Sequence, residues 1–263
     1  QLFHSSCSTP PYSIGGSSTP CLHLSDPPPT PPCIMMKAHR GGRGEVLEDV
    51  DKAIEIVKSW KEDRNMRIHP EAIVPKELLE NCHGLVFLHF MKVGVLISGS
   101  GGSGFVIAKL NKGTSDVHWS APSAIACGAV GLGAQVIGEM VHNVLVLNTA
   151  EAVEKFYSQA KLKVGVDLTV AAGFDGGNRV EAGIDEMLSA EMTTFSYSKG
   201  GGIGFSVEGT VLGVSNDVNK EFYGKSVTAK DILTGAMDED LNSKYPTLQD
   251  LYGQITLYKN SDF

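Results

Sequence analysis

The sequence predicts an α+β fold: a glycine-rich, largely antiparallel β-sheet, barrel-like or sandwich-like, with a few flanking helices. Several stretches alternate apolar and polar residues with the two-residue period of half-buried strands. Of the 30 glycines, 22 fall between Gly84 and Gly213, a density typical of bulges, tight turns and curved sheet rather than of helix. Few helical segments separate the strands, which favours antiparallel connections over a parallel α/β arrangement.

The helices are predicted from apolar spacing and from turn residues. Residues 45–61 form the longest, an amphipathic helix whose apolar positions recur every three to four residues: Leu47, Val50, Ile54 and Val57, with Val46 and Ala53 beside them. Pro75 suits the first turn of a short helix that runs through Cys82. Two further helices are expected over residues 149–160 and from about Thr228.

The strands follow from continuous or alternating apolar runs. Residues 85–91 and 105–110 are continuous runs of strand length. Residues 163–170 alternate strictly, and alternation returns between Phe195 and Val211. No period of about 20 to 50 residues repeats, which argues against a solenoid.

Composition and charge limit the function classes. With 263 residues, 42% of them apolar, the chain is long enough to bury a sizeable core. Its formal net charge of −8 argues against a nucleic-acid-binding protein, which would carry a basic excess. Five widely spaced cysteines without a Cys-x-x-Cys pair indicate neither a disulfide framework nor a zinc ribbon, and they predict reduced thiols in an intracellular compartment.

The chain divides into a tail and one domain. Residues 1–33 are rich in proline and serine, with too little apolar surface to offset the entropy of ordering, so we predict a disordered and dispensable tail. Residues 34–263 are expected to form a single domain. The tail lacks the apolar run of a secretory signal, and the least polar stretch, 121–138, is too rich in alanine and glycine to make a good membrane span. We therefore expect a soluble protein.

Residues 99–104 spell G-x-G-x-x-G, the pattern of dinucleotide-binding loops. Such a loop must open a helix, whereas the apolar run from Phe105 predicts a strand. The acidic residue that should follow about 20 positions later is also missing. We interpret the segment as a glycine-rich β-turn that binds no nucleotide.

The remaining motifs show no catalytic or metal-binding constellation. His83 and His89, near Cys82, have no carboxylate close in sequence, so hydrogen-bonded or solvent-facing histidines fit better than a metal site. Ser103 lacks the final glycine of a nucleophile motif, because Phe105 stands there. No acid–base or nucleophile pair indicates an enzyme, and no cofactor is expected.

Residues 119–124 are distinctive because an indole stands beside a polar turn and a proline. In such a setting Trp119 anchors a loop onto a core or lies at a lipid interface, where the indole has one apolar and one wet side. Both interpretations stay open, with the core favoured.

Many short stretches, in one order, resemble the SYLF family over about residues 73–234. The matching stretches are Ile73-Val74-Pro75, Leu78-Leu79, Gly84-Leu85, Lys92-Val93-Gly94, Gly101-Gly102-Ser103-Gly104, Trp119-Ser120-Ala121-Pro122-Ser123-Ala124, Gly131-Leu132-Gly133, Gln135-Val136-Ile137-Gly138, Leu147-Asn148-Thr149 with Phe156, Ala171-Ala172-Gly173, Ser196-Tyr197-Ser198-Lys199, Val207-Glu208-Gly209, Phe222-Tyr223-Gly224 and Asp231-Ile232-Leu233.

The resemblance implies a non-enzymatic lipid-binding domain, of a type reported to recognise phosphoinositides and, in some fungal members, actin filaments. In the family, lipid binding is attributed to an N-terminal amphipathic helix and basic residues, which here correspond to the segment from Lys37 to Lys61. The chain departs from the family pattern after Gly173 and after Lys199, where an aromatic residue and a nearby arginine are lost or displaced.

The leading hypothesis is a cytoplasmic protein that binds anionic membrane lipid peripherally, with a phosphoinositide as the candidate ligand. The predicted lipid-contact residues are Lys37, Arg40, Arg43, Lys52, Lys58 and Trp119. Residues 37–43 hold three basic side chains and no acid, each worth about 1 kcal/mol near an anionic leaflet. Acidic residues of the following helix oppose this attraction, and we expect its apolar face to be buried in the core. The alternative is an actin-binding or other protein-binding scaffold of the cytoskeleton or endocytic machinery.

Overall fold

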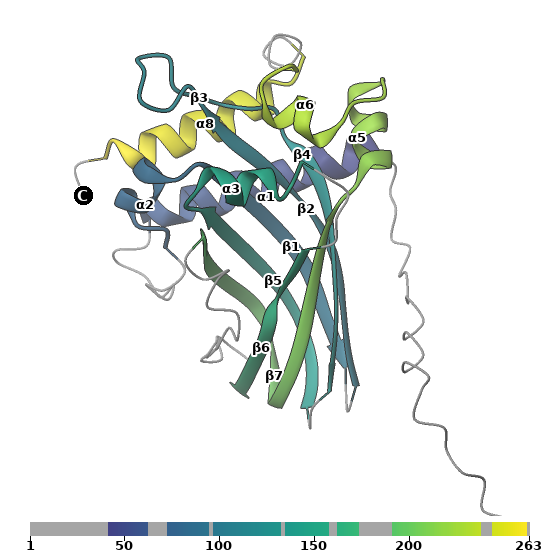
Figure 1. Cartoon of the computed structure of the whole chain (residues 1–263). Helices are drawn as coiled ribbons and strands as arrows, with labels where there is room; N and C mark the ends of the chain where they lie inside the picture. The colour runs from purple at the N-terminus through teal and green to yellow at the C-terminus, as the bar shows by residue number, and fades with distance from the viewer. Residues whose placement is uncertain are drawn as a thin grey trace, which may run out of the picture. The chain divides into compact units, whose positions relative to one another are not determined.

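Seven described strands pair into one curved antiparallel sheet in the computed structural model of the chain (Figure 1). The structure describes residues 42–62, 73–94, 97–132, 135–157, 162–173, 191–237 and 244–261. The strands are β1 (Gly84–Gly94), β2 (Ile97–Leu110), β3 (His118–Trp119), β4 (Ser123–Leu132), β5 (Gln135–Leu147), β6 (Leu162–Gly173) and β7 (Met192–Val214). Their order is β1-β5-β7-β4-β2-β3, with β6 paired to β7 and a further pairing between β1 and β2. Every pairing is antiparallel, which confirms the predicted α+β class.

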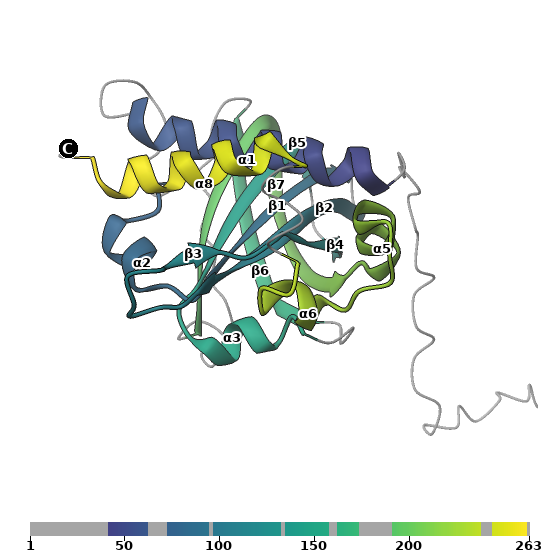
Figure 2. The same cartoon turned by 90° about the horizontal axis from the view of Figure 1, so that it is seen from above.

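The helices gather at one end of the sheet (Figure 1). Those described are α1 (Gly42–Glu62), α2 (Lys76–Asn81), α3 (Ala150–Glu154), α5 (Asn216–Tyr223), α6 (Ala229–Leu233) and α8 (Pro246–Lys259). Seen from above, α1 and α8 run side by side across that end (Figure 2). All described residues belong to one compact unit, which spans residues 36–263.

The predicted helices are confirmed, although their lengths differ in one case. The helix after Thr149 ends at Glu154 rather than near residue 160, and the Thr149 side chain accepts the hydrogen bond that caps it. Helix α6 begins with a reciprocal capping box between Thr228 and Asp231. The apolar patterns do not predict β4, β5, α5 or α8.

Apolar side chains form a core on each face of the sheet. On one face, Phe87 and Phe105 stack with ring centroids 5.2 Å apart in the cluster that includes α1, α5 and α8. On the other face, Val86 and Val106 pack with Phe156. Successive strand residues point to opposite faces, so burial on both faces explains why residues 85–91 form a continuous apolar run.

Helix α1 buries its apolar face, as the sequence predicts. Val46, Val50, Ala53 and Val57 are at most 2% exposed, and Trp60 is also buried. These side chains belong to the same core cluster as residues of α8, α5 and the sheet. Inserting this face into a lipid bilayer would therefore require α1 to leave the core.

Truncating this face is expected to lower stability. Val50→Ala removes two methyl groups from a fully buried site, so we expect a loss of about 2 kcal/mol in the free energy of unfolding. Glu55→Ala, on the exposed face of the same helix, should stay within about 0.5 kcal/mol of wild type. Urea unfolding measures both, and equal midpoints for the two variants would contradict the burial of α1.

The glycine-rich segment 99–104 lies inside β2 and is not a β-turn, so this interpretation of the sequence was wrong. The strand continues through Phe105 to Leu110, as predicted, and no helix opens at Gly104. The glycines are explained by close approach to β1: a Cβ on Gly104 would lie 2.0 Å from the carbonyl oxygen of Phe87. A pattern that fits a turn equally fits two strands in close contact.

Some predictions fall on residues that the structure does not describe. The tail 1–33 and the departure from the family pattern after Gly173 lie outside the described residues. The boundary at residue 34 therefore stays a prediction. Among the described helices, none combines the length and apolar character of a membrane-spanning segment.

Candidate functional site

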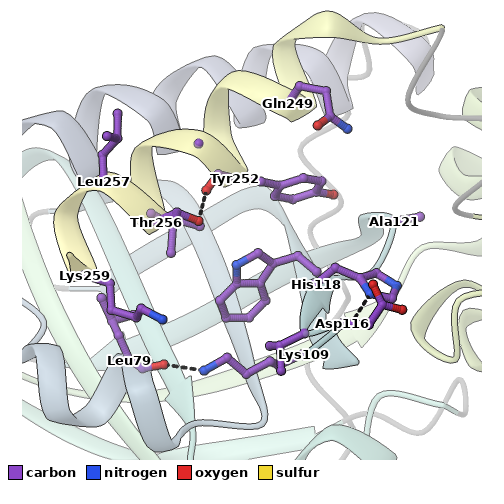
Figure 3. Close-up of a pocket in the computed structure, with 14 residues that line it drawn as sticks. Leu79, Lys109, Asp116, His118, Ala121, Gln249, Tyr252, Thr256, Leu257 and Lys259 are labelled. Carbon is purple, nitrogen blue, oxygen red and sulfur yellow. Dashed lines mark hydrogen bonds between the residues drawn. The ribbon is translucent and has the colours of Figure 1, made fainter. Parts of the chain in front are cut away.

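A groove with a volume of about 840 Å³ lies between α8 and the strand β3 with its preceding turn (Figure 3). The α8 wall consists of Gln249, Tyr252, Gly253, Ile255, Thr256, Leu257 and Lys259. The facing wall consists of Leu79, Lys109, Asp116, Val117, His118, Trp119 and Ala121. Its volume falls in the range of ligand-binding clefts, and it combines apolar surface with a few charged groups.

The spacing of apolar residues in α8 sets which side chains reach the groove. Leu248, Leu251, Ile255 and Tyr258 are buried at three- and four-residue intervals. The neighbouring positions are left on the outer face, where Leu257 is 59% exposed. An exposed leucine on the wall of a groove is apolar surface available to a partner.

Tyr252 fixes the distance between the two walls. Its hydroxyl donates a 2.8 Å hydrogen bond to the backbone oxygen of Ser120, directly after β3. The Ser120 hydroxyl in turn accepts from the backbone nitrogen of Ala108 in β2 at 2.9 Å. A chain of hydrogen bonds therefore joins the two walls of the groove, from α8 through Ser120 to the sheet.

Trp119 and Lys109 lie next to each other on the wall that faces α8. They are paired residues of β3 and β2, and the Lys109 Nζ atom lies 5.5 Å from the centre of the indole ring, within cation–π range. Lys109 Nζ also donates to the backbone oxygens of Leu79 and Glu80, at 2.7 and 2.8 Å. Trp119 is half-buried and packs against the core, which agrees with the favoured of its two predicted settings; contact with lipid stays a prediction.

Burial lowers the pKa of Lys109 below its ordinary value. The positive charges of Lys259 and Lys112 act in the same direction, while Cys82 and Glu80 act against it. Like charges close together destabilise each other's charged forms, so this end of the groove is locally positive. Figure 3 shows Lys109 and Lys259 near Leu79 at one end of the groove.

A turn that precedes β3 closes the other end of the groove. Asn111 and Gly113 adopt positive φ angles of 52° and 89°, which are typical of a tight turn. Asn111 Nδ2 donates to an Asp116 carboxylate oxygen at 3.2 Å, and His118 Nδ1 lies 2.9 Å from the backbone oxygen of Asp116. The negative charge of Asp116 thus lies at the opposite end from the two lysines (Figure 3).

The structure describes four of the six predicted lipid-contact residues, and these four lie in different settings. Lys37 and Arg40 lie outside the described residues, and Arg43 is exposed in the first turn of α1. Lys52 bonds Glu48 and Asp49 at 3.1 and 3.3 Å, within α1. Trp119 lies on β3, in the groove.

Lys58 forms an ion pair with a residue of another helix. Its Nζ atom lies 3.4 Å from the carboxylate of Asp250, which joins α1 to α8. With 3.6 residues per turn, Lys52 and Lys58 point roughly 120° apart around the helix. The Lys58–Asp250 pair is exposed, so it contributes less than about 1 kcal/mol to stability. Lys58 and Lys52 lie on different faces of α1.

A second polar cluster lies sealed under α1. His89 is 4% exposed, and its Nδ1 atom lies 2.7 Å from Nδ1 of His142 in β5. Its Nε2 atom is buried without a hydrogen-bond partner among the described residues, so His89 is neither solvent-facing nor fully hydrogen-bonded, contrary to expectation. Asp49 of α1 is 2% exposed beside Lys52, and burial raises its pKa. The spacing of 53 residues between the two histidines gave no local signal.

Metal-binding and thiol groups can be assessed in the described part of the chain. Within the described ranges, no three His, Cys, Asp or Glu side chains are placed to hold a metal ion. Burial raises the pKa of Cys82, and it raises that of Cys127 to about 12, so neither thiol supplies a thiolate nucleophile near neutral pH.

Comparison with known proteins identifies the family. Residues 128–257 match the family model Ysc84, described as "Las17-binding protein actin regulator". LAS seventeen-binding protein 3 of Saccharomyces cerevisiae is 35% identical over 189 residues, which cover 71% of this chain and 40% of that protein. Human SH3 domain-containing YSC84-like protein 1 is 36% identical over 198 residues, or 73% of this chain and 56% of that protein. The chain belongs to the Ysc84 family of SYLF domains.

This membership confirms the resemblance seen in the sequence. An SH3 domain-containing protein of Schizosaccharomyces pombe is 33% identical over 243 residues, 86% of this chain and 55% of that protein. The Ysc84-family chain thus spans about half the length of the curated relatives that it matches. The family description and the name of the Saccharomyces cerevisiae relative denote binding proteins. No solved structure matches the chain.

The sequence patterns missed the groove, although one of its walls has a readable signal. The buried positions of α8 repeat with helical spacing after Pro246, which stands at the start of the helix. The facing wall comes from residues more than 100 positions earlier, and only folding brings the two together.

Proposed function

We propose that this Ysc84-family chain is a non-enzymatic binding module of the actin and endocytic machinery, and that its partner is a protein. The family description names Las17 binding and actin regulation, and the yeast relative is named for binding LAS seventeen. The partner of this chain is accordingly sought among actin filaments and Las17-type proteins.

The observation that carries this proposal is the groove between α8 and β3. It offers the features of a docking surface: a half-buried indole, a tyrosine whose hydroxyl is already bonded, and an exposed leucine. Aromatic side chains in partly desolvated clefts contribute most of the binding energy at many protein interfaces. The apolar face of α1, the other candidate contact surface, is buried in the core.

Peripheral binding to anionic lipid, including phosphoinositides, is the second candidate function. It rests on the exposed Arg43, which follows Lys37 and Arg40 in the sequence. Such contacts would be electrostatic and screened within about 8 Å at physiological salt, so they predict liposome binding that weakens steeply as salt rises. Burial of α1 favours this surface attraction over insertion of the helix.

Co-sedimentation distinguishes the two candidates. The full chain should pellet with filamentous actin or be retained by immobilised, purified Las17, and Trp119→Ala should weaken that binding about tenfold or more. Leu257→Ser should weaken it less and leave the melting temperature unchanged, because Leu257 is 59% exposed. Met91→Ser, at a similarly exposed apolar residue on β1 outside the groove, is the matched control.

Each outcome of this experiment assigns or removes a candidate. Equal binding by the Leu257 and Met91 variants would remove the groove as the docking site. Failure to bind either protein, combined with salt-sensitive pelleting on anionic liposomes, would replace the protein partner with lipid.

A further inference from the structure

We infer that the groove between α8 and β3 selects an acidic peptide segment, with its carboxylates at the lysine end and an apolar side chain against Trp119 and Tyr252. This inference rests on the proposed function and adds the chemistry of the partner. It follows from the distribution of charge in the groove, from the hydrogen-bond donors that its lysines still have available, and from the aromatic side chains between the charged ends.

The groove is positive at one end although the chain as a whole carries a formal charge of −8. Lys109 and Lys259 line this end of the groove, and the positive charges of Lys259 and Lys112 both oppose that of Lys109. An anion bound beside them would relieve this repulsion, whereas a basic partner would increase it. Charge complementarity of this kind discriminates against wrong partners more strongly than it raises affinity.

Two of these lysines are fixed in place by the end of α2. Lys109 Nζ donates to the backbone oxygens of Leu79 and Glu80, and Lys112 Nζ donates to that of Asn81. An ammonium group has three donors, so Lys109 keeps one for a ligand. Both lysines therefore cap the end of α2, and Lys109 also presents charge to the groove.

Lys259 supplies the accessible charge. It is exposed at the last turn of α8 and forms no hydrogen bond or ion pair with the described part of the chain. A carboxylate that binds it breaks no existing contact. Substitution of Lys259 can thus change ligand binding without disturbing the fold.

The charge at the opposite end sets the direction of the segment. Asp116 is exposed and already accepts a hydrogen bond from Asn111. It would repel a carboxylate, so the acidic residues of the partner belong at the α2 end. Between the two ends, Trp119 and Tyr252 offer aromatic surface for an apolar side chain.

A selection from a random 12-residue peptide library, displayed on beads and probed with the full chain, tests the inference. We expect the enriched peptides to carry Asp or Glu next to an aromatic or aliphatic residue. In fluorescence anisotropy, Lys259→Glu should weaken the best of them about five- to tenfold, and raising the salt should weaken wild-type binding. Lys220→Glu makes the same charge change at an exposed lysine of α5 and should leave binding unchanged.

Peptides without acidic enrichment, no enriched peptide at all, or equal affinity for the Lys259 and Lys220 variants would each overturn the inference. Anionic liposomes that compete for the same site in a manner sensitive to Lys259→Glu would assign the charge to lipid instead. If acidic peptides bind while neither actin nor Las17 does, the inference stands and the proposed function fails. If actin or Las17 binds equally well to Lys259→Glu, the proposed function stands and the acidic partner is excluded.

Discussion

Gly104→Ala is expected to destabilise the fold by about 3 kcal/mol or more, a large fraction of the total stability of a typical domain. A Cβ at this position would lie 2.0 Å from the carbonyl oxygen of Phe87 and 3.0 Å from the Cα atom of Leu88. Both atoms belong to the backbone of β1, so no side-chain rotation relieves the contact. The paired strands would have to separate, and Phe87 lies in the core that they share.

Gly102 is subject to the same constraint. Its added Cβ would lie 2.0 Å from the carbonyl oxygen of His89 and 2.5 Å from the Cα atom of Phe90. The neighbouring Gly101 has no atom within 4 Å of its added Cβ. We therefore expect Gly102→Ala to resemble Gly104→Ala, and Gly101→Ala to be nearly neutral.

Urea or thermal unfolding of the three variants measures this difference. A Gly104→Ala protein that does not fold at all, beside a folded Gly101→Ala protein, supports the close approach of β1 and β2. A difference of less than about 1 kcal/mol between the two would show that the strands are further apart than the structure places them.

Acid should destabilise the protein through His89. Burial lowers the pKa of His89 to about 3, and the charges of His142 and Lys52 act in the same direction. In the unfolded chain the pKa returns to about 6.5. The unfolded state therefore binds a proton that the folded state rejects, and stability falls as the pH drops from about 6.5 to about 3.

The size of this loss of stability follows from the difference between the folded and unfolded pKa values of His89. Each pH unit in this window costs up to about 1.4 kcal/mol, so the full titration removes roughly 5 kcal/mol. The groups that face His89 are Asp49 and Lys52 from α1, Ser103 from β2 and His142 from β5. The raised pKa of Asp49 has the opposite sign, because the folded state then takes up its proton more readily as the pH falls.

Replacement of the histidine isolates its contribution. The free energy of unfolding of His89→Gln should depend less steeply on pH between about 6.5 and 4 than that of wild type. Val50→Ala, which lowers stability without removing a titratable group, should keep the wild-type slope. Parallel curves for wild type and His89→Gln would show that His89 titrates normally and is not sealed in the core.

Local sequence patterns predicted much of the secondary structure and the family membership. The spacing from Val46 to Val57 predicts both the existence of α1 and its buried face, because one helical stripe suffices to cover a sheet. The short stretches matched to SYLF domains agree with the membership shown by the relatives. These features depend on residues close in sequence, which is where a pattern can be read.

Other elements lack a local signal. Strand β4 runs through Ala124, Ala126 and Gly128, whose small side chains show no clear alternation, so its pairing with β2 and β7 appears only in the sheet. The glycines of β2 were ambiguous for a related reason. Absence of a side chain permits a turn or a close contact, and the neighbouring strand decides between them.

The candidate site belongs to the features that only the tertiary structure decided. The sequence singled out Trp119 and the basic residues of α1, but not the other wall of the groove. Lys109, Trp119, Tyr252 and Lys259 form one surface because β3 and α8 pack against a common core, although 150 positions separate the first residue from the last. The sequence by itself determined the segments with a clear apolar period, such as α1 and the first half of β1. Packing determined the remaining elements and which side chains meet, since contacts between distant residues depend on burial and not on local spacing.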